Sequence, residues 1–138
     1  MERLYFDADG NEIRRCDWDI HHVFPRNYAK GNGEKGWIDL FKVPMVKQWH
    51  NFGKGSLHAN VELCPLPDKD MQYRMRLQSY ADESTNPYDR FINMNEYVHH
   101  IADTSRDIRT IWLANRIADN LERQAPYILQ GMVEVVEL

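Results

Sequence analysis

The sequence predicts an α+β fold, because strand-like and helix-like patterns occupy different parts of the chain. Short β-rich segments separated by turn residues precede residue 64. After Pro65-Leu66-Pro67 the apolar residues recur at spacings of three and four, which is typical of helices that pack on a core. The 138 residues suffice for one core, so we expect a single domain, with residues 1–64 as its core and 65–138 as a helical extension.

The N-terminal segment is expected to form a β-hairpin. Leu4-Tyr5-Phe6 and Glu12-Ile13-Arg14 flank Asp7-Ala8-Asp9-Gly10-Asn11, whose glycine, asparagine and aspartates suit a tight turn. The second strand either continues or restarts after Cys16, and it runs through Ile20-His21-His22-Val23-Phe24. Pro25 closes it, since proline has no N–H to offer a neighbouring strand. Because side chains alternate along a strand, His21 and His22 are expected on opposite faces.

The middle of the chain is expected to hold a loop, a strand and two helical turns. Gly31 and Gly33, with Gly36 just beyond, predict a loop over residues 27–35, and residues 37–43 have the composition of a strand. Pro44 suits the first turn of a short helix that reaches Asn51 and carries His50. Ser56 is a suitable N-cap for a further turn that carries His58.

Three helices are expected after residue 67. Asp68 can cap the first, which reaches about Tyr80, and Asn86-Pro87 is an N-cap with proline at the first helical position of the second. Thr104-Ser105-Arg106-Asp107 fits a capping box for the third, which is expected to end before Pro126. Its apolar stripe is expected to comprise Ile108, Ile111, Trp112, Ala118 and Leu121. The tail 132–136 is either a strand or loose.

Composition and charge exclude several classes of protein. No run approaches the roughly 18 apolar residues of a membrane span, and no apolar stretch follows the charged start as in a signal peptide, so we expect a cytoplasmic protein without a membrane partner. Cys16 and Cys64 are too few for a disulfide framework, and we expect free thiols. The net charge of −4 argues against coating nucleic acid by bulk electrostatics. Residues 23–58 nevertheless carry six basic and two acidic side chains.

Two histidine clusters carry the functional prediction. The first reads His21-His22-Val23-Phe24-Pro25-Arg26, and the second contains His50-Asn51 followed by Leu57-His58-Ala59. In order, spacing and neighbouring residues they resemble the motifs of HNH nucleases of the His-Me finger group, most closely the small HNH-like proteins often carried by bacteriophages. The resemblance covers roughly residues 16–64 and implies a ββα core.

The resemblance implies a metal-dependent endonuclease that hydrolyses DNA phosphodiester bonds. His21, His50 and His58 would bind one divalent ion, His22 would be the general base, and Arg26 would contact phosphate. Lys54 is also placed in sequence to contact phosphate oxygens. Three nitrogen ligands favour zinc, nickel or another first-row ion such as manganese over magnesium, which prefers oxygen.

Departures from the family pattern leave a second function open. Asp39 falls where the family has the asparagine that orients the base, and a carboxylate accepts the imidazole N–H without being an amide. His50 and His58 are eight residues apart, whereas the familiar helical pair is four apart. The alternative is therefore a catalytically inactive HNH-fold protein of a phage, with a vestigial metal site, that binds a bacterial host protein through its acidic helical half in the host cytoplasm. A third alternative is a small zinc-stabilised module that binds nucleic acid without chemistry.

Overall fold

The computed structural model describes residues 2–29 and 35–138, which form an α+β fold. Most of the loop expected over 27–35 lies outside the described residues. The chain forms two compact units. The first unit consists of Met1–His21, Val43–Glu62 and Arg123–Leu138, and the second of His22–Lys42 and Leu63–Glu122. Each unit therefore draws on both sides of residue 64.

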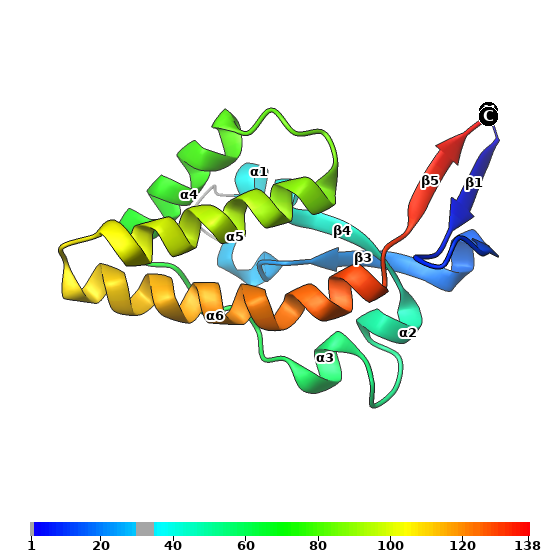
Figure 1. The fold of residues 1–138 in the computed structure, drawn as a ribbon, viewed down its shortest axis with the longest axis horizontal. Helices are drawn as coiled ribbons and strands as arrows, with labels where there is room; N and C mark the ends of the chain where they lie inside the picture. The colour runs from blue at the N-terminus through cyan, green and yellow to red at the C-terminus, as the bar shows by residue number, and fades with distance from the viewer. Residues whose placement is uncertain (1, 30–34) are drawn as a thin grey trace. The chain divides into compact units, whose positions relative to one another are not determined.

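The first unit contains the expected hairpin. Its strand β1 (Arg3–Phe6) pairs antiparallel with β2 (Glu12–Ile13), and Gly10 takes a φ of +83° in the turn between them. The other edge of β1 pairs with β5 (Glu134–Glu137), which makes a three-stranded sheet (Figure 1). The C-terminal tail is thus a strand.

A two-stranded sheet carries the first histidine cluster. A 3-10 turn, η1 (Arg15–Asp17), separates the hairpin from β3 (Trp18–His22), which pairs with β4 (Lys42–Val46). The second strand of the sequence prediction therefore restarts after Cys16. Val43 and Met45 of β4 are fully buried, whereas the residues between and beside them are more exposed. This alternation extends the strand through Pro44 to Val46.

The strand predicted over residues 37–43 is wrong for most of its length. The chain forms a helical turn, α1 (Lys35–Ile38), followed by the 3-10 turn η3 (Asp39–Phe41). Trp37, Ile38 and Phe41 are buried, and their spacing of one and then three residues places them on one side of a helix rather than of a strand. The helix predicted from Pro44 begins later, as α2 (Lys47–His50), and α3 (Leu57–Asn60) follows it.

The second unit is largely helical. Asp68 caps α4 (Lys69–Ala81) by accepting a hydrogen bond from the Met71 N–H, and Asn86 caps α5 (Pro87–Thr104) by accepting one from Tyr88. Both predicted N-caps are confirmed. The two helices lie side by side in Figure 1. A core aromatic cluster contains Phe24, Trp37 and Phe41 with ring centroids 5.5–6.2 Å apart. A further 3-10 turn, η2 (Arg26–Ala29), follows Pro25.

The start of the third helix, α6 (Ile108–Gln130), differs from its prediction. Thr104 belongs to the last turn of α5, where its hydroxyl donates to the His100 carbonyl, so the predicted capping box is wrong. Asp107 instead accepts hydrogen bonds from the first turn of α6. Ile108 and Trp112 are exposed. The buried stripe of this part of α6 consists of Ala114, Ile117, Ala118 and Leu121.

The predicted end of α6 before Pro126 is also wrong. The helix continues through the proline to Gln130, although proline in a helix interior costs roughly 3 kcal/mol. The turn after Pro126 buries Ile128 completely and packs the Tyr127 ring against Trp49, with centroids 6.4 Å apart. Burying one large apolar side chain contributes about 1.5–3 kcal/mol, so this packing offsets the cost of Pro126. No helix in the described ranges is long and apolar enough to cross a membrane.

Candidate metal centre

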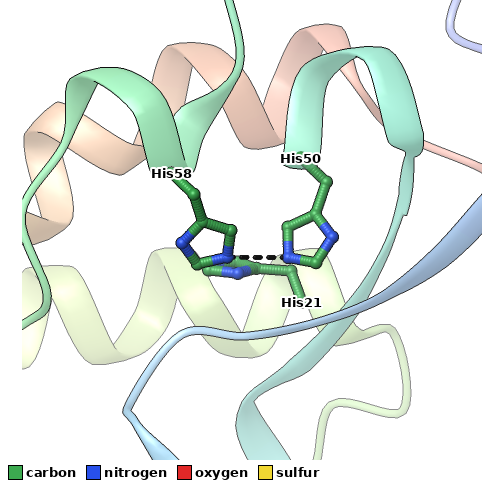
Figure 2. A group of neighbouring side chains, drawn as sticks. All are labelled: His21, His50 and His58. Atoms are coloured by element: carbon green, nitrogen blue, oxygen red, sulfur yellow. Dashed lines mark hydrogen bonds between the residues drawn. The ribbon is translucent and has the colours of Figure 1, made fainter. Parts of the chain in front are cut away.

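Three histidines from three elements of the first unit converge. His21 comes from β3, His50 is the last residue of α2, and His58 lies in α3. One potential ligand atom from each lies within 4.8 Å of the other two, and Figure 2 shows the three rings facing one another. The ring centroids are 4.6–5.3 Å apart. His21 and His50 are buried, and His58 reaches the surface.

The turn between α2 and α3 explains how two histidines eight residues apart meet. Gly53 takes a φ of +90°, which side chains disfavour, so the chain reverses there. The Ser56 hydroxyl donates to the Gly53 carbonyl at 2.8 Å and closes the reversal. Ser56 is the predicted N-cap residue of α3, although its side chain does not cap that helix. The result places Nε2 of His58 2.9 Å from Nε2 of His50.

A carboxylate holds His50 in one tautomer. Asp19 Oδ1 lies 2.5 Å from Nδ1 of His50, and a carboxylate only accepts, so Nδ1 carries the proton. Asn51 donates a longer hydrogen bond, 3.5 Å, to the other oxygen of Asp19. The lone pair of His50 therefore lies on Nε2, the nitrogen that faces His58. In histidine metal sites the nitrogen that does not bind the metal usually donates its proton to a carboxylate, a backbone carbonyl or water.

An amide fixes His21 in the same manner. The side-chain oxygen of Gln124 lies 2.8 Å from Nε2 of His21, and both residues are 2% exposed. Because an amide oxygen accepts, Nε2 is the donor and the lone pair of His21 lies on Nδ1. His21 and His50 thus each offer one nitrogen as a ligand.

Partial burial favours the neutral form of His58. Its partial burial lowers the pKa of the imidazole below its usual value, and the positive potential of a protonated His50 adds to this effect, while Asp19 opposes it. A neutral imidazole is the form that binds a metal ion. The lowered pKa therefore favours the form of His58 that can act as a ligand.

The donor set fits a single divalent ion. In a tetrahedral site with Zn–N distances of about 2.0–2.1 Å the nitrogens lie roughly 3.3 Å apart, close to the 2.9 Å between His50 and His58. The ligand nitrogen of His21 lies within 4.8 Å of those of His50 and His58. It therefore needs to approach them by at most about 1.5 Å to reach the spacing of a tetrahedral site. Three protein ligands leave a fourth position for water or substrate, as in catalytic zinc sites.

The three residues with predicted catalytic roles belong to the second unit. His22, half-buried, ends β3; Arg26 is exposed and begins η2; Asp39 is exposed and begins η3. In β3 His21 is buried and His22 is partly exposed, and their placement on opposite faces stays a prediction. None of the three belongs to the histidine cluster, and their roles stay predictions.

Two residues of the site were not predicted. Asp19 precedes His21 by two residues on one strand, and this spacing puts both on the same face, so it was within reach of sequence reasoning. Gln124 is 103 residues from His21. The sequence indicates a role for Gln124 only weakly. It is a polar residue on the apolar stripe of α6, three residues after Leu121 and four before Ile128.

No family model matches this sequence, and no curated protein or solved structure matches it.

Proposed function

We propose that this protein is a metal-dependent endonuclease that hydrolyses DNA phosphodiester bonds and has an HNH-like ββα core. The observation that carries the proposal is the convergence of His21, His50 and His58, with Asp19 behind His50. The order of β3, β4 and α2 along the chain supports it, because the HNH core consists of two strands and a helix in that order.

The residues divide into ligands, positioning groups and acid–base groups. A divalent ion, when bound, would stabilise negative charge on the scissile phosphate. Asp19 and Gln124 keep His50 and His21 in the tautomers that ligate. From the resemblance, His22 takes a proton from the attacking water, Asp39 accepts its imidazole N–H, and Arg26 contacts phosphate.

The test is nicking of supercoiled plasmid with Zn, Ni, Mn or Mg. We expect wild type to nick with at least one ion, His22→Ala and His58→Ala to lose nicking by at least about 100-fold, and His100→Ala to act as wild type. His100 is the matched control because it is exposed on α5, outside the histidine cluster. Equal inertness of wild type and His22→Ala with every ion would remove the enzyme proposal.

One surface favours the alternative, an inactive protein that binds a host protein. Tyr73, Leu77 and Tyr80 recur along α4 at helical spacing, and each is at least 50% exposed. Such an apolar stripe is typical of a protein-binding surface. The protein is expressed in a bacterial host and growth is measured. Growth arrest that persists in His22→Ala, but is lost when Tyr73, Leu77 and Tyr80 are all changed to serine, would support this function. Arrest lost in His22→Ala would support the nuclease.

A further inference from the structure

A pocket of the first unit is lined in part by the chain segment that carries His50 and His58. It has a volume of about 470 Å³, and Trp49 of α2, the loop before α3, and Pro126 and Tyr127 of α6 line it. This volume falls in the range of about 300–1,000 Å³ that is usual for small-molecule sites. Trp49 directly precedes His50, and Lys54 at the pocket lies between His50 and His58 in the chain. The pocket and the metal centre therefore share the segment from α2 to α3.

One wall of the pocket is aromatic and held in place. The Trp49 and Tyr127 rings meet edge to face with centroids 6.4 Å apart, and Pro126 extends the wall. Gly131 approaches Trp49 so closely that a Cβ there would lie 2.9 Å from the Cβ of Trp49. By contrast, Trp18 and Trp37 are at most 7% exposed and serve as core residues. Trp49 is thus a fixed indole at the edge of a cavity.

The rest of the lining is polar and carries one positive charge. Asn60 donates hydrogen bonds to the backbone carbonyls of Lys54 at 2.7 Å and Ser56 at 2.8 Å, which fixes the loop that bears Lys54. Within the described parts of the chain, the Lys54 ammonium forms no ion pair. Residues 43–61 contain two lysines and no acidic residue, so this segment carries a net positive charge. Gln130 adds an amide to the rim.

We propose that this pocket binds one nucleotide of single-stranded DNA, with the base on the aromatic wall and a phosphate on Lys54. A planar base matches Trp49 and Tyr127, a phosphate matches a lysine without a carboxylate partner, and an amide can bond the base edge. A paired base within a duplex is already stacked, so an unpaired nucleotide is the form that reaches the wall. The inference rests on the proposed function for its substrate class, and it assigns the nucleotide to the chain segment that also carries His50 and His58.

The test measures binding without metal, so that cleavage does not enter it. A fluorescein-labelled oligothymidylate is titrated with the full chain in EDTA, and fluorescence anisotropy gives the Kd. We expect Trp49→Ala to weaken binding about 5- to 150-fold, the range measured for loss of one base–aromatic stack. Trp49→Phe, which keeps a ring, is expected to retain most of the affinity. Lys54→Ala is expected to lower the salt dependence of log Kd by about one unit of slope.

Matched controls separate the pocket from general surface effects. Trp112→Ala removes an exposed tryptophan of α6, and Lys47→Ala removes an exposed lysine of α2 that does not line the pocket. Both are expected to bind as wild type. Circular dichroism verifies that each variant is folded. Wild-type affinity in Trp49→Ala and Lys54→Ala, or an equal loss in the controls, would overturn the proposal.

Two further arms separate this inference from the proposed nuclease. Free thymidine monophosphate should compete with the oligonucleotide, and an oligouridylate that binds more tightly than oligothymidylate would overturn the assignment to DNA. Binding that depends on Trp49 and Lys54 without plasmid nicking would remove the nuclease but keep the pocket. Plasmid nicking together with oligonucleotide binding that is unchanged in Trp49→Ala and Lys54→Ala would keep the nuclease but remove the pocket.

Discussion

Asp19 Oδ1 and His50 Nδ1 lie 2.5 Å apart, and this contact determines which nitrogen of His50 faces the other histidines. We expect Asp19→Asn to reduce zinc affinity by about 10- to 100-fold, the usual effect of losing a carboxylate that bonds a metal-binding imidazole. Competition with a chromogenic chelator measures the change. Asp17→Asn is the control, because Asp17 lies near in the chain and its carboxylate accepts hydrogen bonds from Arg14 rather than from a histidine. Equal losses in both variants would mean that Asp19 acts only through charge.

Removing the metal should destabilise the first unit. The helices α2 and α3 are four residues long each, far below the roughly 12–15 residues that an isolated helix needs, so a shared ion would join them. At a free zinc concentration of 100 Kd the expected gain is about 2.7 kcal/mol, a rise in Tm of several degrees. Thermal melts followed by circular dichroism, with zinc and with EDTA, test this. The same rise in His58→Ala would show that zinc binds elsewhere.

Gly131→Ala should destabilise the protein. Its new Cβ would meet Trp49 Cβ at 2.9 Å, the Tyr127 carbonyl oxygen at 3.1 Å and Met45 Cε at 3.2 Å. Overpacking of this kind costs about 1–3 kcal/mol. Chemical denaturation measures the free energy of unfolding. Gly55→Ala is the control, since a Cβ there meets nothing within 4 Å, and an unchanged Gly131→Ala would show that the segment shifts freely.

The two cysteines should differ in reactivity. Cys16 is exposed, whereas burial raises the pKa of the Cys64 thiol to about 12. Since the thiolate is the nucleophile, iodoacetamide at pH 8 should alkylate Cys16 and leave Cys64 unmodified until the protein unfolds. Mass spectrometry of tryptic peptides over time gives both rates. Comparable rates in the native protein would contradict the burial of Cys64.

Asp107 should make stability depend on pH. The hydrogen bond from the Thr110 hydroxyl, helped by backbone N–H groups of the first turn of α6, lowers the pKa of the Asp107 carboxyl. Because the folded-state pKa is below the unfolded value of about 3.9, the stabilisation is fully present above that pH and is lost as the pH falls through the folded pKa. Asp107→Asn should therefore have a lower Tm than wild type at pH 6, and the difference should vanish in strong acid. A constant difference at all pH values would contradict this linkage.

Local signals in the sequence predicted some elements well. Asp68 and Asn86-Pro87 marked helix starts because a cap depends only on neighbouring residues. The three histidines of the cluster were predicted because their two motifs lie close in the chain. The helical turns at residues 35–41 were missed because a short apolar segment fits the spacing of a helix and that of a strand equally well. The burial of Trp37 and Phe41 in the tertiary structure favours the helical turns. Gln124 and the continuation past Pro126 depend on contacts with distant segments, which no local pattern records.

The first unit consists of three separated stretches of chain, and this governs when it can fold during synthesis. Strand β1 finds its partner β5, and His21 finds Gln124, only after residues 123–138 have left the ribosome. Segments that are synthesised early usually fold first. Here the folding of the N-terminal hairpin and of α2 and α3 into the first unit requires the end of α6. The histidine cluster therefore gains its Gln124 partner only after the end of α6 has been synthesised.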